Sequence, residues 1–450
     1  MLPKKDKLAI PQFLGLLCIF SVFLDKAIRG GGLPFDFYYY YPIFVIFLIS
    51  IPLNHLPLAL PPRWFNVGVL AIIVSGVVVT WLNGLLGFEL LKQTFGILFT
   101  AITYYNVIRI FKFDVSRVFS YYLRFAYWVA LFGVIDNILH IAGIHLTKVL
   151  IDGPYRYREF SIMGEPFYLA LAITPAIVYY TCYFKRTWET AKFRYLILLI
   201  CYLVTYSSTA VMGIGLAAFF ALYMNDFFNL RRNRIIFAPL FLAPVVFLVF
   251  YLIENVNLIN KRYKDTTSLF FSSEINVKEA GKSNSSTFAL YSNYVIARDS
   301  FLDNPLFGSG LGSHPLIYEK TFLKYFPPNY LKGYGPQNQQ DANSRFLRLM
   351  SETGLLGLVL FLASVVAFMA PKSKVNSPQS KELVAINYAV LVYIILGLIR
   401  NGNYINVGFF LFYFLYYFSW LQVKYPSYKT LSKVRTQSTG RRFEARRRLA

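Results

Sequence analysis

Apolar stretches long enough to cross a membrane recur from one end of the chain to the other. Most of them are bounded by basic or turn-forming residues. This pattern predicts an all-α polytopic membrane protein with about twelve transmembrane helices. In chain order they are expected at residues 8–24, 38–54, 65–82, 94–111, 119–141, 166–184, 194–208, 210–226, 235–253, 353–370, 383–400 and 404–422.

One long polar segment interrupts this pattern. Residues 254–352 separate the ninth span from the tenth, and a loop of that length is uncommon unless it has a function. We therefore divide the chain into membrane parts at 1–253 and 353–423, an external loop with short helices at 254–352, and a basic tail at 424–450. The tail has few apolar residues and is expected to be disordered or to lie on anionic lipid.

Composition and charge support a membrane protein and give its orientation. With 56% hydrophobic and 15% charged residues, the chain is not an ordinary soluble domain. The formal net charge of +23 would suggest nucleic acid for a soluble protein, but here basic residues gather in short alternate loops. Clusters at 4–7, 185–194 and 372–381 indicate that both termini are cytoplasmic and that residues 254–352 are external.

The same charge pattern resolves an ambiguous apolar stretch from Tyr195 to Met224. Both of its flanks are basic and are expected on the cytoplasmic side. The stretch is therefore predicted to cross twice, turning near "TYSSTA" at 205–210.

A glycine-rich turn, "DNPLFGSGLGSHP" at 303–315, follows a predicted helix over 285–302 in the external loop. Ser285 or Ser286 can cap that helix, and Pro305 ends it. The glycines permit a tight turn and a close approach to another group. No strand precedes them and no Gly-Lys-Ser follows, so they do not form a nucleotide loop. The three are Gly308, Gly310 and Gly312.

Arg298 continues the apolar spacing of this helix. It follows Phe288, Tyr291 and Val295 at helical intervals, and Leu302 comes next. We therefore expect Arg298 on the buried face, where it needs either a carboxylate or a ligand as its partner.

The tenth span opens with "DANSRFLRLMSETGLLGL" at 341–358. Asp341 is a candidate N-cap, and Arg348 is expected to pair with Glu352 four residues later. Arg345 falls on another face of the helix and has no partner nearby in the sequence.

Together, "DNPLFGSGLG" and "DANSRFLRLMSETGLLGL" resemble the signature region of the O-antigen polymerase and ligase superfamily. At residue level the resemblance is confined to about 155–170, 204–212 and 300–358. It implies a GT-C-like multi-span enzyme of the bacterial inner membrane. Such enzymes join lipid-linked oligosaccharides on the outer face of that membrane.

Two departures from the family pattern favour a polymerase over a ligase. Ligases of the superfamily usually carry a His-Asn pair where this chain has Asn343-Ser344, and many members have Ser-Arg where it has Ser207-Ser208. The polymer would be O-antigen, capsule or exopolysaccharide.

The reaction that the resemblance implies transfers a glycan from a polyprenyl diphosphate, which in bacteria is undecaprenyl diphosphate. The leaving diphosphate suits arginine, whose planar group binds phosphate oxygens in pairs. We see no carboxylate cluster suited to a metal ion, and the three cysteines lie inside apolar runs, so neither a metal nor a cofactor is expected. The diphosphate candidates are Arg158, Arg298, Arg345 and Arg400, although Arg400 could instead reach lipid headgroups.

The acceptor hydroxyl needs a base, for which Asp341 and Glu165 are the first candidates. Asp341 could instead simply cap a helix, and Glu165 could simply begin one, where negative charge is favoured. His314 is a third candidate, and Arg298 is expected to assist catalysis. Substrate contacts are expected from the three glycines, His314 and Asn343.

The expected partners are the lipid-linked oligosaccharide donor and acceptor and membrane lipid, together with flippase and chain-length regulator proteins, but no nucleic acid. A flippase or other transporter is the main competing class. That class predicts two related halves with polar sites near the bilayer midplane, whereas here the polar residues concentrate in one late external loop. A non-catalytic assembly component remains a third alternative.

Overall fold

The computed structural model describes residues 10–25, 27–28, 37–85, 87–147, 157–225, 257–272, 275, 277–328 and 335–426. Within these ranges the chain is almost entirely helical. The strands Ala27–Ile28 (β1) and Phe37–Tyr38 (β2) form one short antiparallel pair. The predicted ninth span, and the basic tail after residue 426, lie outside the described residues.

Eleven of the predicted spans lie wholly or almost wholly within the described residues, and each of them overlaps a helix. Residues 205–207 separate two of them, as the charge pattern predicts. The first membrane part contains α1 (Ile10–Phe20), η1 (Ser21–Phe23), α2 (Tyr40–Leu53), α3 (Arg63–Leu82), α4 (Phe88–Ile110), α5 (Val115–Ile141), α6 (Pro166–Cys182), α7 (Phe184–Thr190), α8 (Lys192–Val204) and α9 (Ser208–Met224). The second contains α15 (Arg345–Ala367), η3 (Lys372–Lys374), α16 (Pro378–Arg400) and α17 (Phe409–Lys424).

Four described helical stretches are long and apolar enough to cross a membrane, namely α3, α5, α15 together with η3, and α16. A fifth crossing is possible if α6 and α7, which meet at a 96° bend, form one broken span. The helices α1 (with η1), α2 and α9 are apolar but shorter. The chain is therefore an all-α membrane protein, while the twelve crossings and the GT-C-like arrangement stay predictions.

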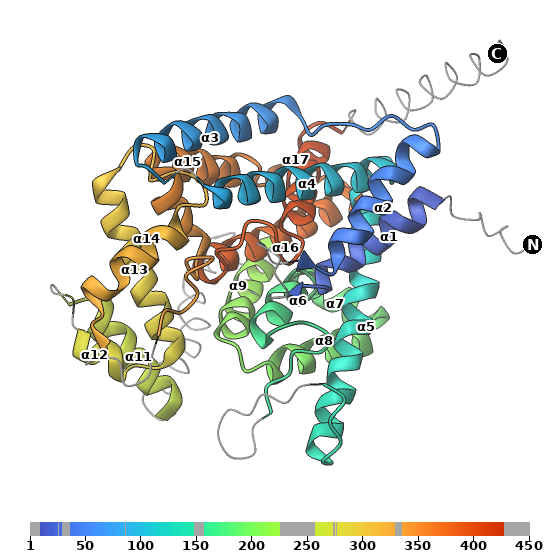
Figure 1. The fold of residues 1–450 in the computed structure, drawn as a ribbon. Helices are drawn as coiled ribbons and strands as arrows, with labels where there is room; N and C mark the ends of the chain where they lie inside the picture. The colour runs from blue at the N-terminus through green and yellow to red at the C-terminus, as the bar shows by residue number, and fades with distance from the viewer. Residues whose placement is uncertain are drawn as a thin grey trace, which may run out of the picture.

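The membrane helices differ in how much protein surrounds them. In α16, 78% of the apolar window is buried against other helices, compared with 17% in α3. Figure 1 shows α16 in the middle of the molecule beside α6 and α9, with α3 along one edge. Because the outward residues of α3 are apolar as well, this helix is suited to face lipid.

The loop predicted to be external folds into four helices within its described part, which we call the external helices: α11 (Asn257–Phe270), α12 (Val277–Lys282), α13 (Ser285–Asp303) and α14 (His314–Tyr325). They form the yellow-to-orange group at one side of Figure 1 and share an apolar cluster that includes Phe288, Tyr318 and Phe322. The helix predicted over 285–302 is confirmed as α13. Its N-cap is Asn284 rather than Ser285 or Ser286.

The glycine turn packs against a break in α15. At Gly354 the backbone leaves helical geometry (φ 59°, ψ −156°). The freed carbonyls of Ser351 and Glu352 accept hydrogen bonds from the backbone N–H groups of Ser309 and Gly310, at 2.8 and 2.9 Å. The turn and the start of the tenth predicted span therefore form one backbone-bonded unit.

Glycine is required at Gly310 for two reasons. Its φ of +102° is unfavourable for residues with a side chain, and a Cβ there would meet the Cγ2 of Thr80 at 2.1 Å. The turn thus fits closely against α3.

Candidate active site

A polar cavity of about 560 Å³ lies where the external helices meet the membrane helices. Its walls come from six parts of the chain that are far apart in the sequence. Its lining residues fall within 158–168, 207–208, 284–289, 336–343 and 400–406, together with Tyr38. Five sequence-predicted site residues are among them: Arg158, Glu165, Asp341, Asn343 and Arg400.

Helix N-termini converge on this cavity. The first residues of α6, α9 and α13 or the residues just before them line it, and α15 begins two residues after Asn343. The N-terminus of a helix carries partial positive charge and unpaired N–H groups. Four such ends around one space favour an anionic ligand.

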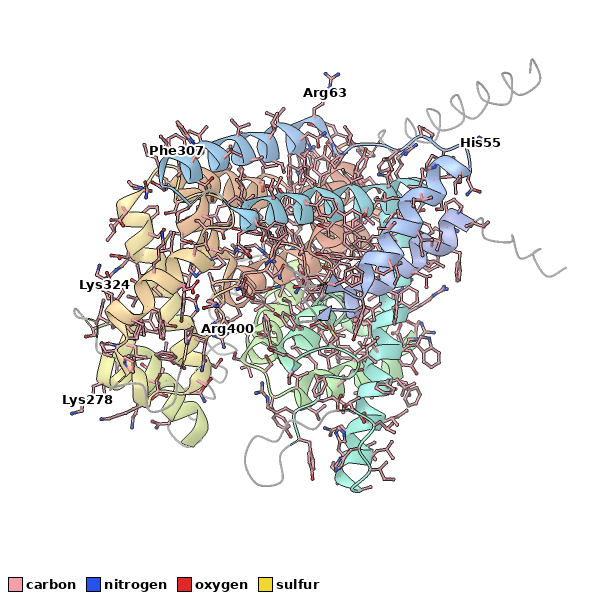
Figure 2. The ribbon with its side chains drawn as sticks, in the orientation of Figure 1. His55, Arg63, Lys278, Phe307, Lys324 and Arg400 are labelled. Carbon is pink, nitrogen blue, oxygen red and sulfur yellow. The ribbon has the colours of Figure 1, made fainter. Side chains whose placement is uncertain are left out.

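Two arginines reach the cavity from different walls. Arg158 lies in the segment before α6, and its Nε donates to the carbonyl of Thr205 at 3.5 Å. Arg400 ends α16 and donates to the carbonyl (3.4 Å) and the hydroxyl of Ser286, in the first turn of α13. Both are half-buried. Figure 2 shows Arg400 between the external helices and α9, so this arginine is directed into the protein.

Two carboxylates line the same space. Asp341 is half-buried, and its Oδ1 accepts the N–H of Asn343 at 3.0 Å. The expectation that Asp341 caps the next helix is wrong, because Ser344 holds that position and accepts the N–H of Leu347 at 3.3 Å. Glu165 is exposed at the N-cap of α6 and makes no side-chain cap hydrogen bond there.

Asn343 lines the cavity and sits in a strained turn. Ala342 and Asn343 both have positive φ, 55° and 56°. The Oδ1 of Asn343 accepts from Asn338 at 3.0 Å, whereas its buried Nδ2 has no hydrogen-bond partner among the described residues. Strain of this kind concentrates at binding and catalytic sites.

An apolar groove of about 420 Å³ adjoins the polar cavity. Tyr38, Gln340 and Asn403 line both spaces and so mark their junction. Leu91 and Phe95 on the groove wall are about two-thirds exposed, which opens the groove to the side of the protein. Its apolar lining comes mainly from α2 and α4: Tyr41, Val45, Phe88, Leu91, Phe95 and Phe99.

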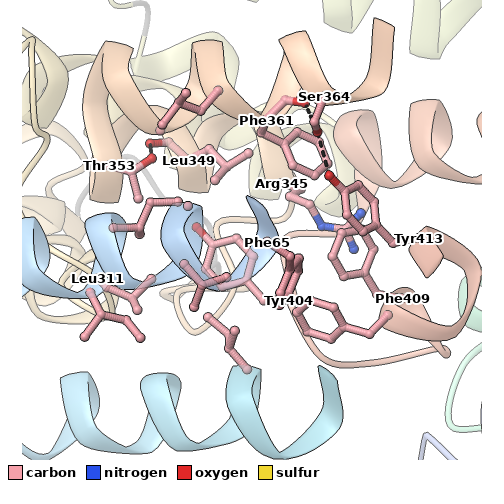
Figure 3. Close-up of a pocket in the computed structure, with 18 of the residues that line it drawn as sticks. Phe65, Leu311, Arg345, Leu349, Thr353, Phe361, Ser364, Tyr404, Phe409 and Tyr413 are labelled. Atoms are coloured by element: carbon pink, nitrogen blue, oxygen red, sulfur yellow. Dashed lines mark hydrogen bonds between the residues drawn. The ribbon is translucent and has the colours of Figure 1, made fainter. Parts of the chain in front are cut away.

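Arg345 lies outside the polar cavity, although the sequence suggested that it binds diphosphate. It is buried beside an apolar pocket of about 230 Å³ between α3, α15 and α17. Figure 3 shows its guanidinium against Phe409, and the distance to the ring centre is 4.0 Å. It donates to the carbonyl of Asn403 at 2.9 Å. Arg345 therefore has a long-range partner, and it orients the loop that carries Asn403.

The ion pair predicted between Arg348 and Glu352 is confirmed at 3.0 Å and is buried. Arg348 also donates to Gln93 in α4 at 2.8 Å and to the carbonyl of Gly402 at 3.3 Å. It thus joins α15, α4 and the loop before α17.

The expectation that Arg298 faces the buried side of α13 is wrong. Phe288, Tyr291 and Val295 are buried as predicted, but Arg298 is exposed and Leu302 is 66% exposed. The apolar spacing continues along the helix, but in its last turns the buried side is the one that carries Ala297 and Ser300, and Ser300 bonds to Ser309 of the glycine turn. Arg298 does not line the polar cavity.

His314 is buried, and both of its ring nitrogens are engaged. Nδ1 lies 3.0 Å from the Ser351 hydroxyl, and Nε2 lies 3.0 Å from the amide oxygen of Asn293. Burial, together with the nearby Arg348 charge, lowers the pKa of His314 to about 3. Neither His314 nor the residues Gly308, Gly310 and Gly312 line the polar cavity. They join α13, α14 and α15 instead.

Sequence reasoning missed the amide-rich part of the cavity wall. Tyr38 accepts hydrogen bonds from Asn403 and Asn406 at 3.3 and 3.2 Å. Two short runs, "PQNQQD" at 336–341 and "NGNYIN" at 401–406, supply most of these polar groups. The sequence signal that could have identified this wall is a run of Asn and Gln residues next to an apolar span.

Comparison with known families supports the resemblance seen in the sequence. Residues 193–362 match the family model described as O-Antigen ligase. This match places the domain at residues 193–362 in the O-antigen ligase and polymerase superfamily. The matched region runs from α8 to the broken helix α15 and includes Asp341 and Asn343, whereas Arg158, Glu165 and Arg400 lie outside it. No curated protein matches the chain.

Proposed function

We propose that this superfamily member polymerises lipid-linked oligosaccharide repeat units and that the polar cavity is its active site. One observation carries the proposal: a cavity with two arginines and several helix N-termini opens into an apolar groove. A polyprenyl diphosphate has the matching form, an anionic head on a hydrocarbon chain. The groove takes the first part of that chain and the cavity takes the diphosphate and the sugars.

In the proposed reaction the acceptor hydroxyl oxygen attacks the anomeric carbon of the donor glycan. The bond from that carbon to the diphosphate oxygen breaks, and its electron pair leaves with the diphosphate. Arg158 and Arg400 stabilise the charge that develops there, together with the helix ends and the Asn343 amide. The two arginines neutralise the charge of the leaving diphosphate, so the proposed step requires no metal ion.

The proton of the acceptor hydroxyl passes to a carboxylate. We assign Asp341 as this base, because it is half-buried and is held by the Asn343 N–H beside the unpaired Asn343 amide. Glu165 is more exposed and is assigned to sugar binding. The proton then leaves to solvent.

We propose that the cavity faces the external side of the membrane. All the elements that line the cavity meet at the helix ends that the basic loops assign to the periplasm. The wild-type cysteines are buried, so a cysteine introduced at exposed Lys320 should alone react with an impermeant thiol reagent on intact cells. A cysteine at exposed Glu189, between α6 and α8, should react only after permeabilisation. The reverse pattern would place the cavity on the cytoplasmic side.

The function is tested by giving the purified protein a lipid-linked repeat unit. A ladder of longer lipid-linked glycans supports the polymerase. In cells, loss of the protein should abolish long chains while single repeat units still reach their final carrier. The family description favours ligation as the second candidate. That candidate gains support if no ladder forms and glycan is instead transferred to a separate lipid acceptor.

A further inference from the structure

A second group of chemically active side chains lies at the outer end of α5. Asp136 and His140 are four residues apart and so share one face of that helix. Glu159, from the segment before α6, reaches the same place. One ligand atom from each of the three lies within 4.8 Å of the other two. None of the three lines the polar cavity.

The three side chains are almost completely buried, with exposed fractions of 0%, 3% and 1% for Asp136, His140 and Glu159. Each carboxylate has one oxygen fixed by a donor. Asp136 Oδ2 accepts the hydroxyl of Thr147 at 2.5 Å, and Glu159 Oε1 accepts the N–H of Ser161 at 2.5 Å. The remaining atoms, Asp136 Oδ1, Glu159 Oε2 and His140 Nε2, have no hydrogen-bond partner among the described residues.

An ion pair alone does not account for this arrangement. His140 Nε2 lies 3.4 Å from Asp136 Oδ1, which is within ion-pair range, but the two atoms are not aligned for a hydrogen bond. An ion pair between His140 and Asp136 would also leave Glu159 Oε2 buried without a partner among the described residues. Burying a carboxylate oxygen without a partner is costly.

We infer that Asp136, His140 and Glu159 bind a divalent transition-metal ion, with zinc favoured by their donor set. One imidazole nitrogen and two carboxylate oxygens form a three-ligand zinc site, with one position left for water. The hydroxyl of Thr147 and the N–H of Ser161 orient the two carboxylates, as outer partners do in metal sites.

The ion would stabilise the structure by linking two segments and would take no part in the reaction. It joins α5 to the segment that carries Arg158, the residue directly before Glu159. The N–H of Glu159 donates to the carbonyl of Val204 at the end of α8, at 3.0 Å. The suggestion that the ion positions Arg158 for the reaction rests on the proposed function, whereas metal binding itself does not.

The test is the metal content of the purified full-length protein after zinc loading and removal of loose metal. We expect about one zinc per wild-type chain. Asp136→Asn and Glu159→Gln should lose it, and Thr147→Val should weaken zinc binding about tenfold because only an outer partner is removed. His55→Gln, at an exposed histidine outside the cluster, is the matched control and should keep the zinc.

Because ligand variants can fold poorly, thermal unfolding of the wild type provides a second measurement. Zinc should raise the Tm of chelator-treated protein, and magnesium at the same concentration should not. Wild-type zinc content no higher than that of Glu159→Gln, or a Tm that zinc does not change, would overturn the inference. It would identify a hydrogen-bonded carboxyl cluster instead, and neither result bears on polymerase activity.

Discussion

The polar cavity and the glycine turn both contain residues that resemble the superfamily signature, but the two regions use their polar groups differently. In the cavity wall, Asn343 Nδ2 has no hydrogen-bond partner among the described residues, and Arg158 and Arg400 line an open space. In the turn, both ring nitrogens of His314 are bonded, and the N–H groups of Ser309 and Gly310 pair with the broken helix α15.

This difference separates ligand-binding from scaffold residues. Groups that bind a ligand need polar atoms directed at an accessible space, whereas groups that maintain the fold satisfy one another inside the protein. By that criterion we propose that the cavity carries the chemistry. The turn holds α15 at its break near Gly354, and Asp341 and Asn343 come just before the first residue of that helix.

The largest effect is expected at the cavity. Arg400→Lys keeps the charge but loses paired contacts with phosphate, so chain elongation should fall roughly a hundred- to a thousand-fold. Lys324→Ala, at an exposed cation of α14, is the control and should elongate normally. The measurement is the ladder assay, with Tm checking that the fold is intact. Normal elongation by Arg400→Lys would remove this arginine from the site.

The next effect is on stability and belongs to the turn. Gly310→Ala adds strain at a φ of +102° and a collision with Thr80, so it should cost at least roughly 1–3 kcal/mol. Thr80→Ser removes the colliding methyl group but keeps the hydroxyl, so the double variant should regain part of the loss. Tm and the yield of folded protein measure this. A fully stable Gly310→Ala that cannot elongate chains would indicate a direct role in the reaction.

His314→Gln should lower stability by roughly 1–3 kcal/mol by breaking buried hydrogen bonds. The stability difference between the wild type and this variant should change with pH in a defined direction. Burial lowers the folded-state pKa of His314 from 6.5 to about 3. Between those values the unfolded state binds more protons, so wild-type stability falls as pH drops from about 6.5 towards 3. The stability gap between wild type and variant should therefore narrow in acid. A gap that widens would show that His314 is charged in the folded protein.

The smallest effect is expected for Arg298→Ala. The sequence suggested that Arg298 binds diphosphate and assists catalysis, but the side chain is exposed and does not line the cavity. We expect elongation and Tm close to wild type, since exposed substitutions usually change stability by less than about 0.5 kcal/mol. A loss comparable to that of Arg400→Lys would restore Arg298 to the site.

The helices could be predicted because apolar length and basic flanks are local properties of the sequence. The break at residues 205–207 followed from charge alone. Arg298 and Arg345 were misplaced because their surroundings depend on contacts between distant segments. The last turns of α13 bury the side that carries Ser300 and leave Arg298 exposed, and Arg345 donates to a carbonyl 58 residues away.

Arg158 and Arg400 were named from their positions at predicted span ends, and the fold brings both to one cavity. The cluster at Asp136 was not recognised. Its third member, Glu159, approaches α5 only through the chain's return towards α6, and no spacing rule in the sequence predicts that approach.

The central claim is that the cavity and groove together bind a polyprenyl diphosphate. The most direct measurement is the Kd of purified wild-type protein and of an Arg158→Ala, Arg400→Ala double variant for a polyprenyl diphosphate, with the polyprenyl alcohol as the uncharged control. We predict that the double variant binds the diphosphate at least about a hundredfold more weakly, while its affinity for the alcohol is unchanged. Equal diphosphate affinity in the two proteins would contradict the account.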